Sequence, residues 1–212
     1  MYRPPQAARP RHRPSSRHEP HIYVLDYLEM GNPSDIHYEH RNQPFVQGIG
    51  VRYFTLLEAT PLIGVKIDVL EKVDLSYPSK LKRIILITYN ELTSVARGNL
   101  LEAINRIITE NEQIFVEFFN LAEPINIRLH ALELLPDVGK KTMNAILDAR
   151  KQGKFKGFND IRERVGIDPI KALAGRILKE ISGDEKYCLF IKPHDRQSLY
   201  LGYLERLYGE LI

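Results

Sequence analysis

Hydrophobic and polar residues alternate most regularly in the stretch 63–69, where every second position is Ile or Val. A period of two predicts a β-strand with one buried face. Runs rich in β-branched and aromatic residues also occur nearby, at 22–25, 51–57 and 83–88. We therefore expect four or five short antiparallel strands within residues 21–90. An OB-like β-barrel is the most economical arrangement of such strands, because a barrel closes its own edges.

Hydrophobic residues recur at steps of three and four between residues 91 and 120, which is typical of helices with one buried face. One helix is expected over Leu92–Ile108, with an interruption near Gly98, and a shorter helix over 114–119. We assign residues 91–123 to helices that link the sheet to the following region.

Residues 124–183 are expected to form two helical hairpins in tandem. In the first, Pro136 ends a helix over 127–135, and Gly139 allows a backbone angle that other residues resist. The second helix of this hairpin then begins at Lys140.

The second hairpin has its own start and stop signals. Asn159 is expected to cap its first helix, and a turn through Gly166 leads to the next one. Asp168 can cap that final helix with Pro169 at its first position, and Gly183 ends it.

The chain ends with a strand-like run at 186–192 and an amphipathic stretch at 194–212. A strand that follows a helical region needs a partner, and our hypothesis is that this one completes the barrel beside Ile22–Leu28. We expect the final stretch to form a helix that docks either on its own domain or on a partner.

The formal net charge of +3 is unevenly distributed along the 212 residues. Residues 1–20 carry five Arg and one Glu, and 126–182 carry twelve Lys and Arg against seven Asp and Glu, so the rest of the chain has a net charge of −6. The two basic segments favour contact with a polyanion, although mild asymmetry also occurs on ordinary solvated surfaces. The Pro- and Arg-rich segment 1–20 has almost nothing to bury and is expected to be disordered.

Cysteine content and hydropathy indicate a reduced setting. Cys188 is the only cysteine, no apolar run reaches the roughly 20 residues that cross a membrane, and no signal-type segment begins the chain. A cytoplasmic location is the default expectation. His37, Glu39 and His40 suggest a metal site, but no further ligand lies at a recognised spacing, so a solvated loop is the simpler interpretation. We expect no metal and no other cofactor.

The helix start at Lys140 is the strongest candidate for binding chemistry. Exposed N–H groups at a helix N-terminus attract phosphate, and Lys140 and Lys141 add two positive charges there. The expected nucleic-acid-binding residues surround this point or follow it in the basic segment: Pro136, Val138, Gly139, Lys140, Lys141, Thr142, Lys151, Lys154, Lys156 and Gly166. Basic and aromatic side chains of the sheet could add a second surface, although alternation turns half of any strand toward the core: Arg52, Tyr53, Phe54, Lys66, Lys82 and Arg83.

Residues 126–182 resemble the tandem helix-hairpin-helix modules of DNA repair and DNA uptake proteins. The pattern Leu-Pro-Gly-apolar-Gly-Lys-Lys/Thr is matched over Leu135–Thr142, and the run 158–167 resembles the link to the second hairpin. Asp137 replaces the Gly of the pattern, and its carboxylate opposes a phosphate nearby; Asp168 replaces the second Gly of the second hairpin. The resemblance implies backbone binding by the first hairpin and a weaker or purely structural use of the second.

Over residues 21–192 the sequence also resembles an archaeal family of unknown function, the domain of unknown function 655 proteins. This likeness rests on three segments: Leu92–Arg97, Asn111–Asn120 and Arg128–Pro136. It implies an OB-like domain followed by helix-hairpin-helix elements and a role in RNA or DNA binding.

We therefore expect an α+β protein with a small OB-like antiparallel β-barrel and an all-α tandem helix-hairpin-helix domain. Its expected function is non-enzymatic binding of RNA or DNA through the phosphate backbone, largely independent of base sequence. Two alternatives stay open. One is a nucleic-acid-processing enzyme of the repair or nuclease type, which needs clustered carboxylates or an activated nucleophile. The other is a scaffold whose hairpins bind protein.

Overall fold

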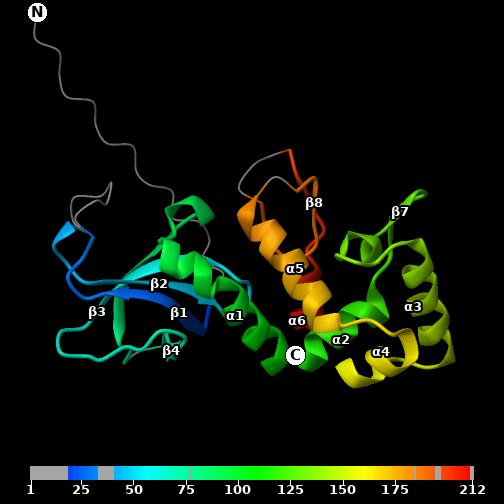
Figure 1. Cartoon of the computed structure of the whole chain (residues 1–212), viewed down its shortest axis with the longest axis horizontal. Helices are drawn as coiled ribbons and strands as arrows, with labels where there is room; N and C mark the ends of the chain where they lie inside the picture. The colour runs from blue at the N-terminus through cyan, green and yellow to red at the C-terminus, as the bar shows by residue number, and fades with distance from the viewer. Residues whose placement is uncertain (1–18, 33–40, 77, 184, 194–196, 211–212) are drawn as a thin grey trace, which may run out of the picture.

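The computed structural model describes residues 19–32, 41–76, 78–183, 185–193 and 197–210. Within these ranges, a curled antiparallel sheet forms one half of the molecule and helices form the other half (Figure 1). Most of the basic N-terminal segment and the suggested metal ligands lie outside the described residues: 1–18, His37, Glu39 and His40.

The five-stranded sheet is an open half-barrel with the strand order β4-β1-β2-β3-β5, so β4 and β5 are its edges. Its strands are β1 His21–Leu28, β2 Phe45–Gly50, β3 Leu56–Pro61, β4 Lys72–Asp74 and β5 Leu81–Leu86. Irregular register in β1, after Val24, and in β3, after Glu58, adds bend and twist to the sheet. The expected strands near 22–25 and 83–88 are confirmed as β1 and β5.

The alternating stretch 63–69 is a loop between β3 and β4, so the clearest of our strand predictions is wrong. Ile67 is buried in the loop, whereas Ile63 is 98% exposed. Ile67 packs with Ile22 and Val24 in a small core on the sheet face opposite the first helix. Val65 of the same loop is partly buried against this core, so the loop packs on the sheet through side chains without pairing as a strand.

The expected strand at 51–57 is confirmed only at its end, where β3 begins, because residues 51–55 form the tight connection between β2 and β3. The carboxylate of Glu19 holds this connection by accepting the backbone N–H groups of Arg52 at 2.8 Å and Tyr53 at 3.0 Å. Burial raises the pKa of Glu19 despite these hydrogen bonds. Phe54 lies in the core with a positive φ of 55°.

The helices of the chain are α1 Ser94–Glu110, α2 Glu112–Leu121, α3 Lys140–Gln152, α4 Phe158–Val165, α5 Pro169–Ser182 and α6 Tyr203–Glu210. The two helices expected after the sheet are confirmed, but they separate at Asn111 and α1 runs through Gly98. Thr93 caps α1 by accepting the N–H of Ala96 at 3.0 Å, and its hydroxyl donates to Asp26 of β1 at 2.6 Å. These bonds fix the start of α1 on the sheet, and burial of its apolar face outweighs the cost of about 1 kcal/mol for one glycine.

The helix expected over 127–135 is wrong. Its place is taken by a small hairpin and one 3₁₀ turn: β6 Pro124–Asn126, β7 Leu129–His130 and η3 Ala131–Leu134. His130 starts the turn, because its Nδ1 accepts the N–H of Leu132 at 3.1 Å while Glu133 accepts the N–H of His130 at 2.9 Å. This reciprocal cap holds the strand-to-turn change at residue 131.

The expected cap of α5 is confirmed, since the Asp168 carboxylate accepts N–H groups of its first turn, Pro169 is its first residue and Gly183 ends it. The expected cap of α4 is wrong, because Gly157 rather than Asn159 is its N-cap. The Glu112 carboxylate accepts the first amide of α4 at 2.5 Å and passes so close to residue 157 that a Cβ there would lie 2.9 Å from it.

The segment 186–192 does not complete the barrel, so that hypothesis is wrong. Its strand β8 Tyr187–Cys188 pairs in parallel with β9 Leu199–Tyr200. The buried Glu180 carboxylate of α5 explains the difference, because it accepts the backbone N–H groups of three successive residues at 2.7–2.8 Å: Leu189, Phe190 and Ile191. The segment is therefore bound to α5 rather than to β1.

The amphipathic helix α6 docks on its own chain and buries Tyr203, Leu204 and Leu207. Phe118 of α2 meets the rings of Phe190 and Tyr203 edge to face, with centroids 5.0 Å apart in both pairs. One continuous hydrophobic cluster extends from the sheet through α1, α2 and α5 to α6. The sheet and the helices are thereby held in a fixed relationship.

Candidate nucleic-acid interface

The turn between η3 and α3 is a type II turn over residues 135–138. The N–H of Val138 donates to the carbonyl of Leu135 at 3.2 Å, Pro136 holds the second position, and Asp137 holds the third with φ 64°. Glycine is usual at that third position, and Asp tolerates it better than most residues. The amide of Val138 is therefore used within the turn, and Val138 itself is buried.

Gly139 is the N-cap of α3 and has an extended backbone, φ −88° and ψ −178°. The residue with the left-handed angle is thus Asp137, which corrects our expectation for Gly139. A Cβ added at Gly139 would meet no atom within 4 Å. The glycine is not required by contacts within the described chain, and its effect is to leave the approach to α3 open.

The first turn of α3 combines exposed amides with positive charge. Lys140 and Lys141 are exposed and Thr142 is half-buried. No side chain among the described residues caps this helix, and the first intrahelical bond runs from Met143 N–H to the Gly139 carbonyl at 2.8 Å. The amides of the first turn are therefore available to an external acceptor such as a phosphate oxygen.

Helix α5 supports this turn from the side. A Cβ built at Gly175 would lie 3.1 Å from Cγ of Pro136, so the helix backbone passes directly beside the proline. At the start of α5, the Lys171 ammonium lies 3.2 Å from the Asp137 carboxylate. Lys171 therefore belongs to the same surface as Lys140 and Lys141, although the sequence did not single it out. The signal was present, because the Asp168-Pro169 cap places Lys171 in the first turn of α5.

The turn between α4 and α5 has no equivalent open amides. Gly166 ends α4 in the left-handed conformation, φ 79°, and donates its N–H to the Arg162 carbonyl at 2.9 Å. Asp168 accepts the N–H groups of Ile170 and Lys171 at 3.1 and 3.4 Å. The helix-ending role explains Gly166, and an internal carboxylate already occupies the start of α5.

Three further lysines of the candidate set lie at the other end of α3 or just beyond it. Lys151 pairs with Asp148 at 2.9 Å, Lys154 pairs with Glu117 of α2 at 2.9 Å, and Lys156 is exposed. A helix of 13 residues is about 20 Å long. The structure thus separates the candidate residues into two groups, with the uncapped amides at the Lys140 end.

The sheet residues considered as a second surface do not lie together. Phe54 is a core residue. The Arg52 guanidinium lies 4.6 Å from the ring centroid of Tyr208, and the ring of Tyr53 packs edge-on against the same tyrosine. The remaining three are exposed at other places, on the loop after β3 or on the edge strand β5: Lys66, Lys82 and Arg83.

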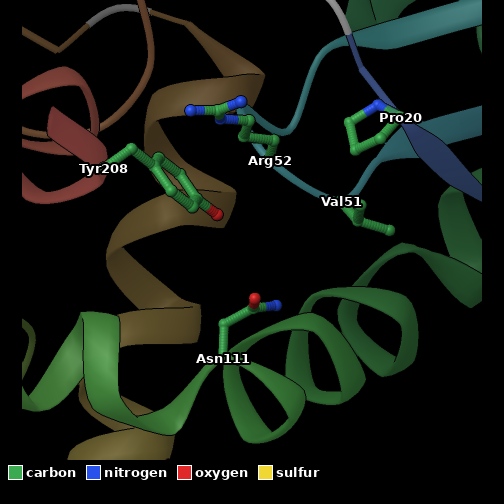
Figure 2. Close-up of a pocket in the computed structure, with 5 residues that line it drawn as sticks. All are labelled: Pro20, Val51, Arg52, Asn111 and Tyr208. Atoms are coloured by element: carbon green, nitrogen blue, oxygen red, sulfur yellow. The ribbon is translucent and has the colours of Figure 1, made fainter. Parts of the chain in front are cut away.

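A shallow pocket of about 280 Å³ lies where the sheet, the α1–α2 junction and α6 meet. It is lined by Pro20, Val51, Arg52, Asn111 and Tyr208 (Figure 2). The Tyr208 hydroxyl and the Asn111 amide point into the space between them (Figure 2). Burial and the nearby Glu19 carboxylate raise the pKa of Tyr208, so its hydroxyl is neutral near pH 7. The pocket is lined by none of the candidate lysines. It lies at the boundary between the sheet and α6.

The part of the chain that the structure describes contains neither a group of metal-binding side chains nor a membrane-spanning helix. No three side chains of His, Cys, Asp or Glu are grouped there closely enough to hold a metal ion. None of the described helices has the length and apolar character needed to cross a membrane.

The fold and the site define a mixed α+β protein whose half-barrel sheet and helical half share one core and present an exposed, lysine-flanked helix start. The chain belongs to the family of proteins of unknown function named DUF655, whose model matches residues 18–192. This finding confirms the family that the sequence resembles.

Two archaeal relatives agree with this assignment. The chain is 39% identical over 191 residues to the uncharacterized protein MJ0038 of Methanocaldococcus jannaschii. The matched region covers 86% of this chain and 84% of that protein. It is also similar to the crystal structure of Af1531 from Archaeoglobus fulgidus, a DUF655 protein, with a TM-score of 0.73 and 40% identity over 82% of this chain and 100% of that chain.

Proposed function

We propose that this protein is a non-enzymatic nucleic-acid-binding protein that holds the phosphate backbone at the start of α3. In this proposal η3, the 135–139 turn and α3 act as a helix-hairpin-helix element, and the half-barrel acts as an OB-like domain. The observation that carries the proposal is the uncapped first turn of α3 beside Gly139, with Lys140 and Lys141 exposed on it.

Two kinds of donor converge at this point. The amides of the first turn of α3 point along the helix axis toward an incoming phosphate, and the positive end of the helix dipole favours its charge. The ammonium groups of Lys140 and Lys141 then pair with the same phosphate or with its neighbour. A missing side chain at Gly139 lets the backbone of the ligand come close.

The turn between α4 and α5 supports the first site and does not itself bind phosphate. Asp168 already occupies the start of α5, whereas Lys171 of that helix reaches toward the first turn and offsets the charge of Asp137. Contacts of this kind go to phosphate and carry no base information. The protein should therefore bind RNA and DNA with little sequence preference and with strong salt dependence.

The test compares the double charge reversal Lys140→Glu/Lys141→Glu with a matched double reversal at exposed lysines elsewhere, Lys179→Glu/Lys192→Glu. Full-length protein is titrated against single- and double-stranded RNA and DNA at two salt concentrations. The first variant should lose at least about tenfold in affinity and about two units of salt slope, because each lost phosphate contact removes about 0.9. The matched variant should retain most of its affinity.

Three results would overturn the proposal: no binding of any of the four nucleic acids by the native protein, unchanged binding after reversal at 140 and 141, or an equal loss in the matched variant. A protein that binds none of them but captures a polypeptide through α3 would favour the scaffold alternative.

A further inference from the structure

The β6–β7 hairpin carries a fully exposed isoleucine at its tip. Ile127 has a relative exposure of 105%, so the rest of the chain covers none of its side chain. The carboxamide of Asn126 accepts the N–H of Arg128 at 2.9 Å and closes the tip around it. Turn tips normally carry Gly, Asn, Asp or Ser, and a β-branched apolar residue there has no local conformational role. The turn thus holds Ile127 outward as a projecting apolar group.

The base of the hairpin is fixed to the helical half. The N–H of Ala131 donates to the Glu123 carbonyl at 3.1 Å across the base. The Arg150 guanidinium of α3 donates to three carbonyls at the C-terminal end of α2, just before the hairpin, at 2.9–3.2 Å: Phe119, Asn120 and Ala122. The projecting tip is therefore held in a set relationship to α3.

The hairpin is connected to the proposed phosphate-binding point through η3. β7 contacts η3, and η3 contacts α3. In Figure 1 the hairpin projects from the helical half at the end where α3 begins. Arg128 at the tip and Lys140, Lys141 and Lys171 near the turn are all exposed and positively charged, so both the hairpin tip and the start of α3 carry charge that attracts a polyanion.

We propose that Ile127 is a wedge that enters a base step of the nucleic acid held at α3 and partly unstacks it. This inference rests on the proposed function and names how the ligand is deformed. Apolar side chains such as Ile, Leu and Phe serve this purpose in proteins that kink duplexes, because the stacked bases offer an apolar surface once the phosphates are held. Arg128 beside the tip pairs with the adjoining phosphate. The bound ligand is therefore a duplex, or a stacked strand, that is opened at one step.

The test uses the full chain and duplex DNA or RNA carrying 2-aminopurine at successive positions, whose fluorescence rises when the base is unstacked. The native protein should raise the signal on binding, and because binding is largely independent of sequence the rise should appear at several labelled positions. Ile127→Asn should abolish that rise and weaken binding by about fivefold, with an unchanged salt slope because no charge is altered. Ile127→Phe should retain the rise. The matched control is Ile63→Asn, since Ile63 is also almost fully exposed (98%) but lies on the sheet half.

Each outcome bears on the proposal. A native protein that binds with no fluorescence rise, or an Ile127→Asn variant that retains it, would overturn the wedge and leave phosphate binding intact. Absence of all binding would overturn the wedge and the proposed function together. A change of oligomeric state in Ile127→Asn, measured by sedimentation, would assign the tip to contact with another protein molecule and would also overturn the wedge.

Discussion

The ammonium of Lys171 lies 3.2 Å from the carboxylate of Asp137, and this pair joins the start of α5 to the turn before α3. Both side chains are about three-quarters exposed, at 75% and 79%, so the pair adds little to stability. Its main effect is electrostatic. It places a cation against the one carboxylate of the 135–139 turn, and under the proposed function it offsets the repulsion between that carboxylate and a phosphate at Lys140.

Substitution of Asp137 by Asn should therefore tighten nucleic-acid binding. Asn tolerates the left-handed backbone of this position and removes only the charge. We expect an affinity gain of about threefold at low salt and a steeper salt slope, because Lys171 becomes free to contact phosphate. The free energy of unfolding should change by less than about 0.5 kcal/mol. Titration at two salt concentrations and a urea unfolding curve measure the two effects.

The control for this prediction is Lys171→Gln, which leaves Asp137 uncompensated and should weaken binding. The interpretation fails if Asp137→Asn binds more weakly than the native protein, since the carboxylate would then contribute to binding directly.

The buried carboxylate of Glu180 should be essential for stability. It pairs with the Arg176 guanidinium at 2.7 Å, and the side chains are 0% and 3% exposed, respectively. Glu180→Gln leaves the buried Arg176 guanidinium with Glu185, at 2.9 Å, as its remaining carboxylate partner and places an amide donor against backbone N–H groups. Removing one partner of a buried ion pair costs about 3–5 kcal/mol. Urea denaturation should show a loss of this size, whereas the exposed neighbour variant Lys179→Gln should lose less than about 0.5 kcal/mol. A loss below about 1 kcal/mol would contradict this account of the 189–191 segment.

The ring of Phe190 should contribute as much to the free energy of unfolding as a core residue of the sheet does. It is fully buried and meets the rings of Phe115 and Phe118, with centroids 6.2 and 5.0 Å apart. Phe190→Ala should lower the free energy of unfolding by about 3–5 kcal/mol, because it leaves a cavity at the centre of the helical half. Leu199→Ala, at a position 51% exposed, is the control and should cost far less. Similar small losses for both variants would show that the C-terminal segment is not part of the main core.

Local signals in the sequence predicted the elements whose cause is itself local. The Asp168-Pro169 cap, the end at Gly183 and the amphipathic pattern of α6 were predictable because each depends on residues within one or two turns. The stretch 63–69 was not, because Ile67 and Val65 pack against the sheet from a loop while Ile63 and Val69 are exposed, so the alternation does not correspond to strand pairing. The position of 186–192 was not predictable either, since it depends on hydrogen bonds to Glu180 on another element.

The candidate site shows the same division. The placement of Lys140 and Lys141 at a helix start followed from Pro136 and Gly139, which closely precede them in the sequence. The contact between Asp137 and Lys171 spans 34 residues, and neither residue alone indicates it. The contact depends on the packing of α5 against the turn.

The neutral imidazole of His130 should make stability sensitive to mild acid. Burial, with help from the charge of Arg150, holds the pKa of His130 below its usual range, although Glu133 and Glu123 act in the opposite direction. The unfolded chain, with an ordinary pKa of about 6.5, then takes up the proton more readily than the folded protein. The contribution of His130 is therefore complete above about pH 6.5 and is lost as the pH falls through the folded-state pKa.

The structural cause is that Nδ1 of His130 accepts the Leu132 N–H, and protonation removes this acceptor. His130→Asn keeps an acceptor at the cap but cannot titrate, so its melting temperature should fall less between pH 7.5 and 5.5 than that of the native protein. The control is Lys179→Gln, at an exposed position, which should keep the native pH dependence. If the melting temperatures of His130→Asn and the native protein decrease by the same amount over this range, the turn at residue 131 does not depend on a neutral His130. Nucleic-acid binding at pH 5.5 provides a second readout, because melting of η3 would displace the turn that positions α3.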